Sequence, residues 1–523
     1  MLSRALAVVL PLALPPLALA QDAETPAQPP AQEPSGAVAG PVLELTLEDA
    51  LRIALERNLT LELEAITTEI ARYDYAGSWG TFDPTWTVGG SWTDATVEPQ
   101  FSFEGSANES TTASFNTGLS VPFTTGGVLD LTFQHDNEDT NNQVAVNATS
   151  STDVLTVALT QPLLRGAWKR FATTDQRESE LGLWRQEARN EEIRQGVLRD
   201  VANAYWDLVG AAEQLGVREV ALSTAQQQLD QDQRRLEVGV GTEVNVLQSE
   251  TNVAQLEEQR LLAESNLRAA EDGLRALLFQ RTENDLATEA ASWDWPIVSL
   301  TPLPGVEAGR VPDWLASLEL AVRDRPELAQ QRFEIEASEV RLERARSNRL
   351  PGLDFNLSMR SRGFDSKTDE AFEEALSIDF PVYSAGLNFS LPLRNRTARF
   401  AERSAHAGVR AARITYDQIE LTVLSEVRNA VRDLIYAGQN VAAASTSRDF
   451  AERQLAAEEA RYQEGLSTTF QVLEFQRDLA EALSALTTAR AGYAKALVAL
   501  RHAEGGLRPP VEDDDATPLE VSE

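Results

Sequence analysis

The sequence of 523 residues contains no cysteine, three histidines and two methionines. A chain without cysteine has no disulfide, no thiol nucleophile and no thiolate ligand for a metal ion. The three histidines, His135, His406 and His502, are far apart, and no serine-hydrolase order, phosphate-binding loop or metal-ligand spacing is present. The acidic run Glu512–Asp515 is better interpreted as a solvated tail than as a cation site. The sequence therefore predicts no catalytic residue, no metal site and no cofactor, which argues against an enzyme.

Long apolar runs and excess positive charge are also missing. Beyond the N-terminal segment, no run approaches the 18 or more apolar residues of a transmembrane helix. The formal net charge is −35, which argues against a nucleic-acid partner because such a partner requires a basic surface. Neither absence argues against a β-barrel, since a barrel contacts lipid through the apolar side chains of its strands.

The N-terminus has the features of a secretory signal peptide over residues 1–20. Arg4 supplies the positive charge, residues 5–19 are only Ala, Leu, Val and Pro, and the small residues Ala18 and Ala20 fit the cleavage rule. The alternative is a short membrane anchor, but three prolines in a run of about 15 residues argue against it. Residues 21–40 are predicted to be a disordered lead-in and residues 508–523 a disordered acidic tail.

Two halves of the chain are similar to each other. The stretch RLEVGVGTEVNVLQ from Arg235 matches RYQEGLSTTFQVLE from Arg461 at an offset of 226 residues. Nearer the start of each half, Ala54 matches Ala321 at an offset of 267. Similar segments in the same order indicate an internal duplication. The predicted division is a first repeat over residues 41–290, a Pro- and Trp-containing connector over 291–312 and a second repeat over 313–507.

Each repeat contains a strand-like segment, at residues 84–162 and 351–392. Trp86, Val88 and Trp92 alternate with polar or small residues, which predicts strands with one apolar and one polar face. A soluble sandwich would alternate in the same way, but small polar faces and terminal aromatics favour a barrel. The first segment is longer by 37 residues. We expect an extra hairpin at residues 113–135, which either joins the barrel or forms an external loop, and we favour the loop.

The remaining sequence is rich in helix-forming residues and lacks proline from 163 to 295 and from 393 to 508. Apolar residues recur every three or four positions, as in a coiled coil. Each run is interrupted once by glycine-containing residues, at Val238–Thr242 and at Glu464–Thr468. We therefore predict two long antiparallel helical hairpins, over residues 167–285 and 396–505. Thin hairpins bury little apolar surface by themselves, which predicts an oligomer.

These features together resemble the TolC-like family of outer-membrane efflux proteins. The most specific similarities lie at the tips Glu237–Val244 and Tyr462–Thr468, in the opening helix Leu47–Asn58 and at the strand–helix junction Leu159–Gly166. The resemblance implies a mixed, mainly α fold: coiled-coil hairpins form a periplasmic tunnel, and trimerisation completes an antiparallel transmembrane β-barrel of 12 strands. It also implies a homotrimer in outer-membrane lipid, with a periplasmic extension whose tips meet an adaptor (membrane fusion) protein and an inner-membrane transporter.

The resemblance also assigns roles to residues near the tips. Family channels carry two acidic rings at a constriction, and the matching positions here are Gln471 and Glu474, of which only Glu474 is charged; its repeat mate is Gln248. Tyr462 matches a tyrosine of the family's closed-state latch, whose Asp and Arg partners match Asn245 and Ser467, so we predict a different or looser latch. The adaptor-binding residues implied are Val238, Gly239, Val240, Gly241, Thr242, Glu464, Gly465, Leu466, Ser467 and Thr468.

Each of these assignments has a simpler alternative. Glu474 is one of 81 acidic residues and is also consistent with a solvated helix face, and Tyr462 with an aromatic packed beside a turn. For the whole chain, the alternative is a soluble periplasmic or surface coiled-coil structural protein. That alternative does not account for amphipathic strands in both repeats.

Overall fold

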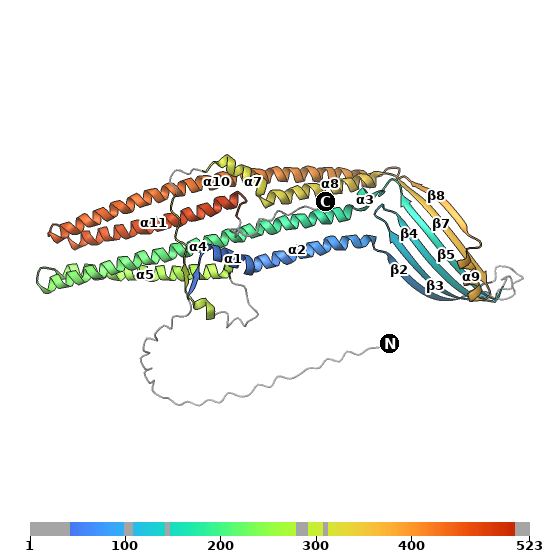
Figure 1. Ribbon diagram of the computed structural model, residues 1–523, viewed down its shortest axis with the longest axis horizontal. Coiled ribbons are helices and arrows are strands. Elements are labelled where there is room, and N and C mark those ends of the chain that lie inside the picture. Colours follow the sequence, from blue (N-terminus) through green and yellow to red (C-terminus); the bar gives the residue numbers. More distant parts are fainter. Residues whose placement is uncertain (1–41, 99–107, 142–146, 279–290, 307–311, 508–523) are drawn as a thin grey trace, which may run out of the picture.

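The computed structural model describes residues 42–98, 108–141, 147–278, 291–306 and 312–507. The predicted signal peptide, lead-in and acidic tail lie outside these residues. Within them, a long bundle of helices continues at one end into a single curved sheet, as Figure 1 shows. The described helices include none that is long and apolar enough to cross a membrane.

Two long helices run through most of the bundle, α4 (Thr174–Glu237, 64 residues) and α10 (Arg396–Gln463, 68 residues). At a rise of 1.5 Å per residue each is about 100 Å long. Shorter helices lie end to end beside them (Figure 1), and the contacts between helices give the order across the bundle. Near the sheet the order across the bundle is α2 (Leu59–Ser78), α4, α8 (Pro326–Arg349) and α10; near the tips it is α5 (Glu243–Leu278), α4, α11 (Thr469–Ala503) and α10.

The helix boundaries reproduce the two sequence offsets. Helices α1 (Leu47–Arg57) and α7 (Trp314–Asp324) begin 267 residues apart, and α5 and α11 begin 226 residues apart. In both repeats the opening helix starts at a side-chain cap, Thr46 before α1 and Asp313 before α7. The helices of the two halves therefore begin at equivalent positions, and the hairpin turns lie at Val238–Thr242 and Glu464–Thr468.

The connector contributes to the core at the middle of the bundle. Strands β1 (Leu43–Leu45) and β6 (Ile297–Ser299) form a small parallel sheet against α4. The buried Tyr205 hydroxyl donates to the Leu45 carbonyl oxygen and accepts from the Thr301 amide, both at 3.0 Å. This one side chain ties the N-terminal strand and the connector to the first long helix, with both backbone groups satisfied.

The large sheet is antiparallel and has six strands in the order β2-β3-β4-β5-β7-β8. The preference for an external loop at residues 113–135 was wrong, because β3 and β4 pair along their length with β2 and β5 inside the sheet. Alternation along a strand indicates which face a side chain occupies, but it does not identify the neighbouring strand. The strands are β2 (Thr85–Val97), β3 (Asn108–Pro122), β4 (Val128–Thr140), β5 (Thr149–Pro162), β7 (Gly352–Asp365) and β8 (Val382–Ser390).

One face of this sheet is apolar from edge to edge, as the alternation predicts. A single row of paired residues crosses all six strands: Trp86, Leu119, Leu131, Val157, Met359 and Tyr383. At the two edges, Trp86 is 72% exposed and Tyr383 is 70% exposed. Large apolar side chains in such numbers on one face indicate contact with an apolar surrounding.

A short helix that the sequence analysis did not predict, α9 (Thr368–Ser377), covers the end of this face that lies away from the bundle. Its Phe372 packs edge-on against Phe133 of β4, with ring centroids 5.5 Å apart. Beneath the helix, Oδ1 of the buried Asp153 forms a hydrogen bond with Nδ1 of the His135 ring at 2.8 Å. The polar residues at this end of the apolar face are therefore shielded by α9.

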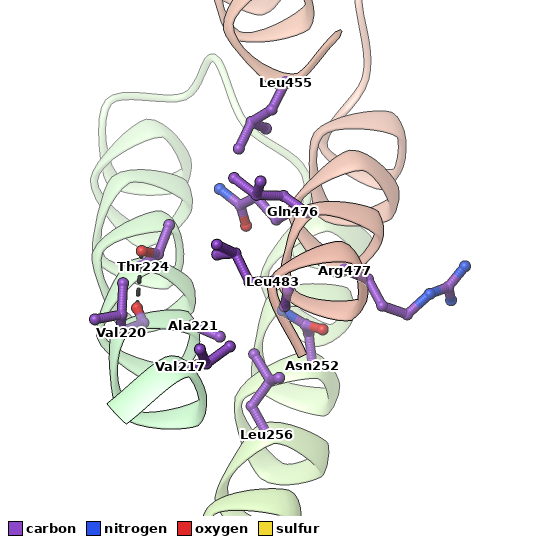
Figure 2. Close-up of a pocket in the computed structure, with 12 residues that line it drawn as sticks. Val217, Val220, Ala221, Thr224, Asn252, Leu256, Leu455, Gln476, Arg477 and Leu483 are labelled. Carbon is purple, nitrogen blue, oxygen red and sulfur yellow. Dashed lines mark hydrogen bonds between the residues drawn. The ribbon is translucent and has the colours of Figure 1, made fainter. Parts of the chain in front are cut away.

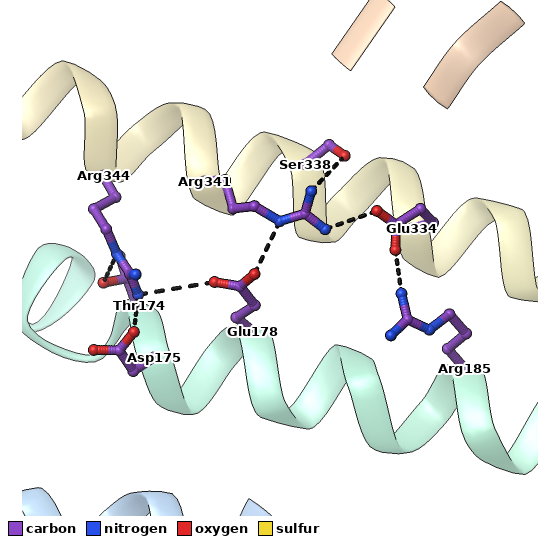
Figure 3. A network of polar contacts seen from close by, with 8 residues as sticks. All are labelled: Thr174, Asp175, Glu178, Arg185, Glu334, Ser338, Arg341 and Arg344. Atoms are coloured by element: carbon purple, nitrogen blue, oxygen red, sulfur yellow. Dashed lines mark hydrogen bonds and ion pairs between the residues drawn. The ribbon is translucent and has the colours of Figure 1, made fainter. Parts of the chain in front are cut away.

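Ion pairs hold the two repeats together where the bundle meets the sheet. Figure 3 shows Arg341 of α8 bound to Glu178 of α4 at 2.9 Å and to Glu334 at 2.7 Å. On the same helix, Glu343 lies between Arg170 and Arg177, with 2.9 Å to the Arg177 guanidinium. Hydrogen bonds from Arg170 and then Arg177 lower the pKa of Glu343 from 4.5 to about 2.

Replacing Glu343 with glutamine is expected to destabilise the protein at neutral pH but not near pH 2. The folded-state pKa lies below the unfolded value, so the stabilisation is present above pH 4.5 and is lost as pH falls towards 2. Because the arginines reach water, we expect about 1 kcal/mol rather than the full linkage value. Melting temperatures of the wild type and E343Q at pH 7 and at low pH would test this, and an equal difference at both would contradict it.

Candidate functional site

The two hairpin turns at the tips have the same backbone design. Gly239 (φ +76°) follows α4, and Gly465 (φ +72°) follows α10, in the left-handed conformation that ends a helix. The amides of Gly239 and Gly465 return to the carbonyl oxygens of Leu236 and Tyr462 at 3.0 Å. The next helix then starts at a threonine in both turns, Thr242 and Thr468, whose hydroxyls accept from backbone amides at 3.3 and 3.4 Å.

Both tips expose apolar side chains. Val238 and Val240 at the first tip are 73% and 76% exposed, and Leu466 and Phe470 at the second are 70% and 59% exposed. Of the other predicted tip residues, Gly239, Thr242, Glu464, Gly465 and Thr468 are exposed, and Gly241 and Ser467 are half-buried. Exposed apolar groups on two adjacent turns are typical of a protein-binding surface.

Just above the tips, a buried polar cluster joins the two hairpins. Asp232 of α4 is 2% exposed, and its carboxylate accepts from the Tyr462 hydroxyl of α10 at 2.8 Å and from the Ser249 hydroxyl of α5 at 2.7 Å. Gln228 donates to it at 3.2 Å and the Thr469 hydroxyl of α11 at 3.4 Å. We call these five residues the tip cluster. It takes one or more side chains from each of the four helices that meet there.

The tip cluster holds the carboxyl group of Asp232 out of water. Buried charges are costly unless hydrogen bonds satisfy them, and Asp232 receives four donors. Burial raises the pKa of the Tyr462 hydroxyl, and the adjacent Asp232 carboxylate raises it further, so the hydroxyl remains a donor. The Arg235 guanidinium lies 4.2 Å from the centre of the Tyr462 ring, which places a positive charge beside the cluster.

The structure places the predicted latch differently from the sequence analysis. Tyr462 does bridge the hairpins, but in the described part of the chain its hydroxyl bonds Asp232 and Thr469 rather than Asn245 or Ser467. Ser467 instead bonds Glu458 and Gln471 within the second hairpin. The two matched positions are uncharged, and a different or looser latch stays a prediction; beside Tyr462, Asp232 and Arg235 supply a carboxyl group and a guanidinium from α4.

A sequence signal for Asp232 did exist. The 226-residue offset pairs Asp232 with Glu458, so both repeats carry an acid at the same position near the tip. Both are buried, at 2% and 5% exposed. The match does not by itself indicate burial, because Asp207 and Asp433 match at the same offset and both are exposed.

The predicted constriction residues lie one turn into the last helix. Glu474 is half-buried and forms an ion pair with Arg477, which also lies 3.8 Å from Glu481. Gln471 is exposed, and its side-chain oxygen accepts from the Ser467 hydroxyl at 2.9 Å. Gln248 is half-buried at the matching position of α5. The role of these residues in a gate stays a prediction, and the Arg477 ion pair reduces the field that Glu474 would contribute.

Between the tip cluster and the middle of the bundle, the hairpins are separated by an apolar cleft. Figure 2 shows Leu256 and Val217 of the first hairpin near Leu483 of the second, while the Arg477 side chain extends away from the cleft. The side chains that line it are mainly aliphatic. The specific polar contacts between the hairpins therefore lie on either side of this cleft, in the tip cluster and, towards the middle of the bundle, in the Lys495–Asp207 ion pair.

Comparison with known proteins identifies the family. The family model described as outer membrane efflux protein matches residues 51–278 and 317–506, one match in each repeat. The chain belongs to this family. Among curated relatives, the protein is 27% identical over 263 residues to the proteases secretion protein PrtF of Dickeya chrysanthemi, covering 48% of this chain and 53% of PrtF. It is 26% identical over 313 residues to the pyoverdine export outer membrane protein OpmQ of Pseudomonas aeruginosa, covering 59% of this chain and 61% of OpmQ.

Solved structures of outer-membrane channels share the fold of this family member. The CmeC channel of Campylobacter jejuni aligns with a TM-score of 0.63 at 17% identity, over 89% of this chain and 87% of CmeC. The open state of the MtrE channel of Neisseria gonorrhoeae aligns with a TM-score of 0.63 at 17% identity, over 88% and 90%. The predicted fold class, helical hairpins joined to an antiparallel sheet, is thereby confirmed. The chain spans about half to three-fifths of the length of the curated relatives it matches.

Among the described residues, no group of three or more His, Asp or Glu side chains could hold a metal ion. The family and the solved neighbours are transport channels.

Proposed function

We propose that this protein is the outer-membrane channel of a tripartite export system. The observation that carries the proposal is the apolar row from Trp86 to Tyr383, which crosses a six-stranded sheet joined directly to two long hairpins. A sheet with one apolar face and two open edges suits a barrel wall in lipid, completed by further copies. A soluble coiled-coil structural protein, the alternative, leaves this row without a function.

In the proposed assembly the protein is a homotrimer, with its sheet in outer-membrane lipid and its hairpins in the periplasm. The exposed tips contact a periplasmic adaptor, which connects the channel to an inner-membrane transporter. The tip cluster holds the hairpins in their closed arrangement, and Glu474 lies near the narrow end. OpmQ and PrtF are named for export of pyoverdine and of proteases, so family membership supports export without selecting one class of cargo.

The test of the proposed function is whether the purified protein forms pores. Reconstituted into a planar lipid bilayer, it should give discrete conductance steps. The same protein should require detergent for extraction from the outer-membrane fraction. Release from the membrane by salt alone, or an absence of conductance steps from a folded preparation, would contradict the proposal.

Replacing Leu466 with aspartate is expected to abolish export without changing the channel. The side chain is 70% exposed at the tip, so a charge there costs little in stability but prevents burial against an adaptor. Leu466→Met, which keeps an apolar side chain, is the matched control and should retain export. A cell-based export assay, together with bilayer conductance, separates the two effects. Normal export by L466D would remove this tip from the proposed adaptor surface.

A further inference from the structure

The edge strands of the sheet, β2 and β8, have no neighbouring strand on their outer sides in the described part of the chain. All nine residues of β8 are exposed, and they include no charge and no proline. Open edges of this kind readily pair with other chains, and soluble proteins usually protect them with charges, bulges or proline. Because β8 carries none of these protections, its sequence is suited to pairing with another strand.

The number of strands allows a second copy to supply that strand. Neighbouring strands run antiparallel throughout the sheet, and an even number of strands makes β2 and β8 run in opposite directions. Under rotational symmetry, β8 of one copy can therefore pair antiparallel with β2 of the next. Trp86 and Tyr383 belong to the same apolar row, so the apolar face continues across the joint.

The extra hairpin is an anchored part of this sheet. Its turn is fixed to the start of the helical bundle, where the Trp168 amide donates to the Thr125 carbonyl oxygen at 3.0 Å. The Thr125 hydroxyl donates to the side-chain oxygen of Gln161 on β5 at 3.0 Å, and the Gln161 side-chain amide donates to the Thr125 carbonyl oxygen at 3.1 Å. Gly126 (φ +85°) approaches so closely that a Cβ there would lie 2.6 Å from the Gly166 carbonyl oxygen. These contacts hold β3 and β4 between β2 and β5.

We propose that three copies of the chain close a barrel of 18 strands, in place of the 12 that the family resemblance implies. The inference rests on the trimer of the proposed function and adds the pairing of β8 with β2 of the next copy. Each copy contributes its whole six-stranded sheet.

The width of the helical bundle can accommodate this number. Four helices lie side by side next to the sheet, so three copies form a ring of 12. With helix axes 8–10 Å apart, the circumference of that ring is about 95–120 Å. Strands about 4.8 Å apart and tilted by about 40° give a circumference of about 113 Å for 18 strands, but only about 75 Å for 12. Eighteen strands therefore continue the helical tunnel at nearly constant width.

The consequence is a wider outer opening. Barrel diameter grows roughly linearly with strand number, so 18 strands give a diameter of about 36 Å between backbones, one and a half times that of 12 strands at the same tilt. The face opposite the apolar row carries small, mostly polar side chains, suited to a water-filled lumen. One row on that face is Thr85, Ser120, Asp130, Ala158, Ser358 and Ser384.

Cysteine pairs can test the arrangement, because the chain has no cysteine of its own. Thr93 faces Thr112 across β2 and β3, and Thr132 faces Thr156 across β4 and β5. Both pairs, changed to cysteine, should form disulfides in the membrane-inserted protein, detected by mass spectrometry after oxidation. If the hairpin instead projected from a 12-stranded barrel, neither of these two disulfides would form. A pair within the hairpin, Ser120→Cys with Asp130→Cys, should link in both arrangements and serves as the control.

Electron cryomicroscopy of the trimer in lipid nanodiscs gives the strand count directly. Eighteen strands in cross-section are expected. Twelve strands, or failure of both inter-hairpin links while the control pair forms in a conducting trimer, would overturn this inference and leave the proposed function intact. A preparation that forms neither trimers nor pores would overturn the proposed function as well.

Discussion

Replacing Asp232 with alanine is expected to raise the conductance of the reconstituted channel and to let large antibiotics pass the outer membrane. The substitution removes the acceptor for Tyr462 and Ser249, and leaves those buried hydroxyls without the carboxylate that now binds them. An unsatisfied buried group costs roughly 1–3 kcal/mol. A loss of about 2 kcal/mol from the closed arrangement shifts the closed-to-open ratio by about 30-fold in each copy.

Variants of graded severity make this prediction specific. Asp230→Asn is the matched control, because Asp230 is exposed on the same helix and its charge is removed without touching the tip cluster. Ser249→Ala removes one donor to the carboxylate and should give a smaller increase than Asp232→Ala. If Asp232→Ala lowers the melting temperature but leaves conductance and antibiotic entry unchanged, the cluster stabilises the hairpins without controlling their opening.

The elements of this fold could be predicted because their signals are local. Alternation at Trp86 to Trp92 identifies a strand and its faces, and glycines at 239 and 465 end long helices. Because the sequence is duplicated, the boundaries of a helix can be predicted twice, once in each repeat. The place of β3 and β4 in the sheet could not be predicted in this way. It depends on contacts between Thr125 and residues far along the chain, which no periodicity records.

The site was partly predicted for a similar reason. Tyr462 stood out through family resemblance, and the structure does place it between the hairpins. By resemblance, the acidic partner of this tyrosine in the family matches Asn245, whereas the carboxyl group beside Tyr462 in this structure is that of Asp232 on the preceding helix. A buried acid on a helix looks like any solvated acid in a chain with 81 of them. The repeat aligns Asp232 with Glu458, but it also aligns the exposed Asp207 and Asp433, so it does not identify the buried acid.

Helix α9 should come off the sheet when Gly363 is replaced with alanine. A Cβ at this position of β7 would lie well inside contact distance of the Ala371 carbonyl oxygen and 2.8 Å from the Ala375 amide nitrogen, both backbone atoms of α9. Backbone cannot yield as a flexible side chain does, so the helix must shift or detach. Overpacking of this kind costs typically 1–3 kcal/mol. Displacement would also separate Phe372 from Phe133 and uncover the buried Asp153.

Proteolysis of intact cells measures this displacement. Lys367 precedes α9 at the end of the sheet away from the bundle, which the proposed topology places outside the cell. Trypsin should cut after Lys367 about fivefold faster or more in G363A than in the wild type, because the free energy of local opening falls by about 1 kcal/mol or more. Gly386→Ala is the control, because a Cβ there meets nothing within 4 Å. Since alanine is less flexible than glycine in the unfolded chain, G386A should be neutral or slightly stabilising.

Equal cleavage of all three proteins would show that α9 does not depend on the close approach at Gly363. Protection of Lys367 in intact cells, with cleavage only after lysis, would place this end of the sheet inside and contradict the proposed topology.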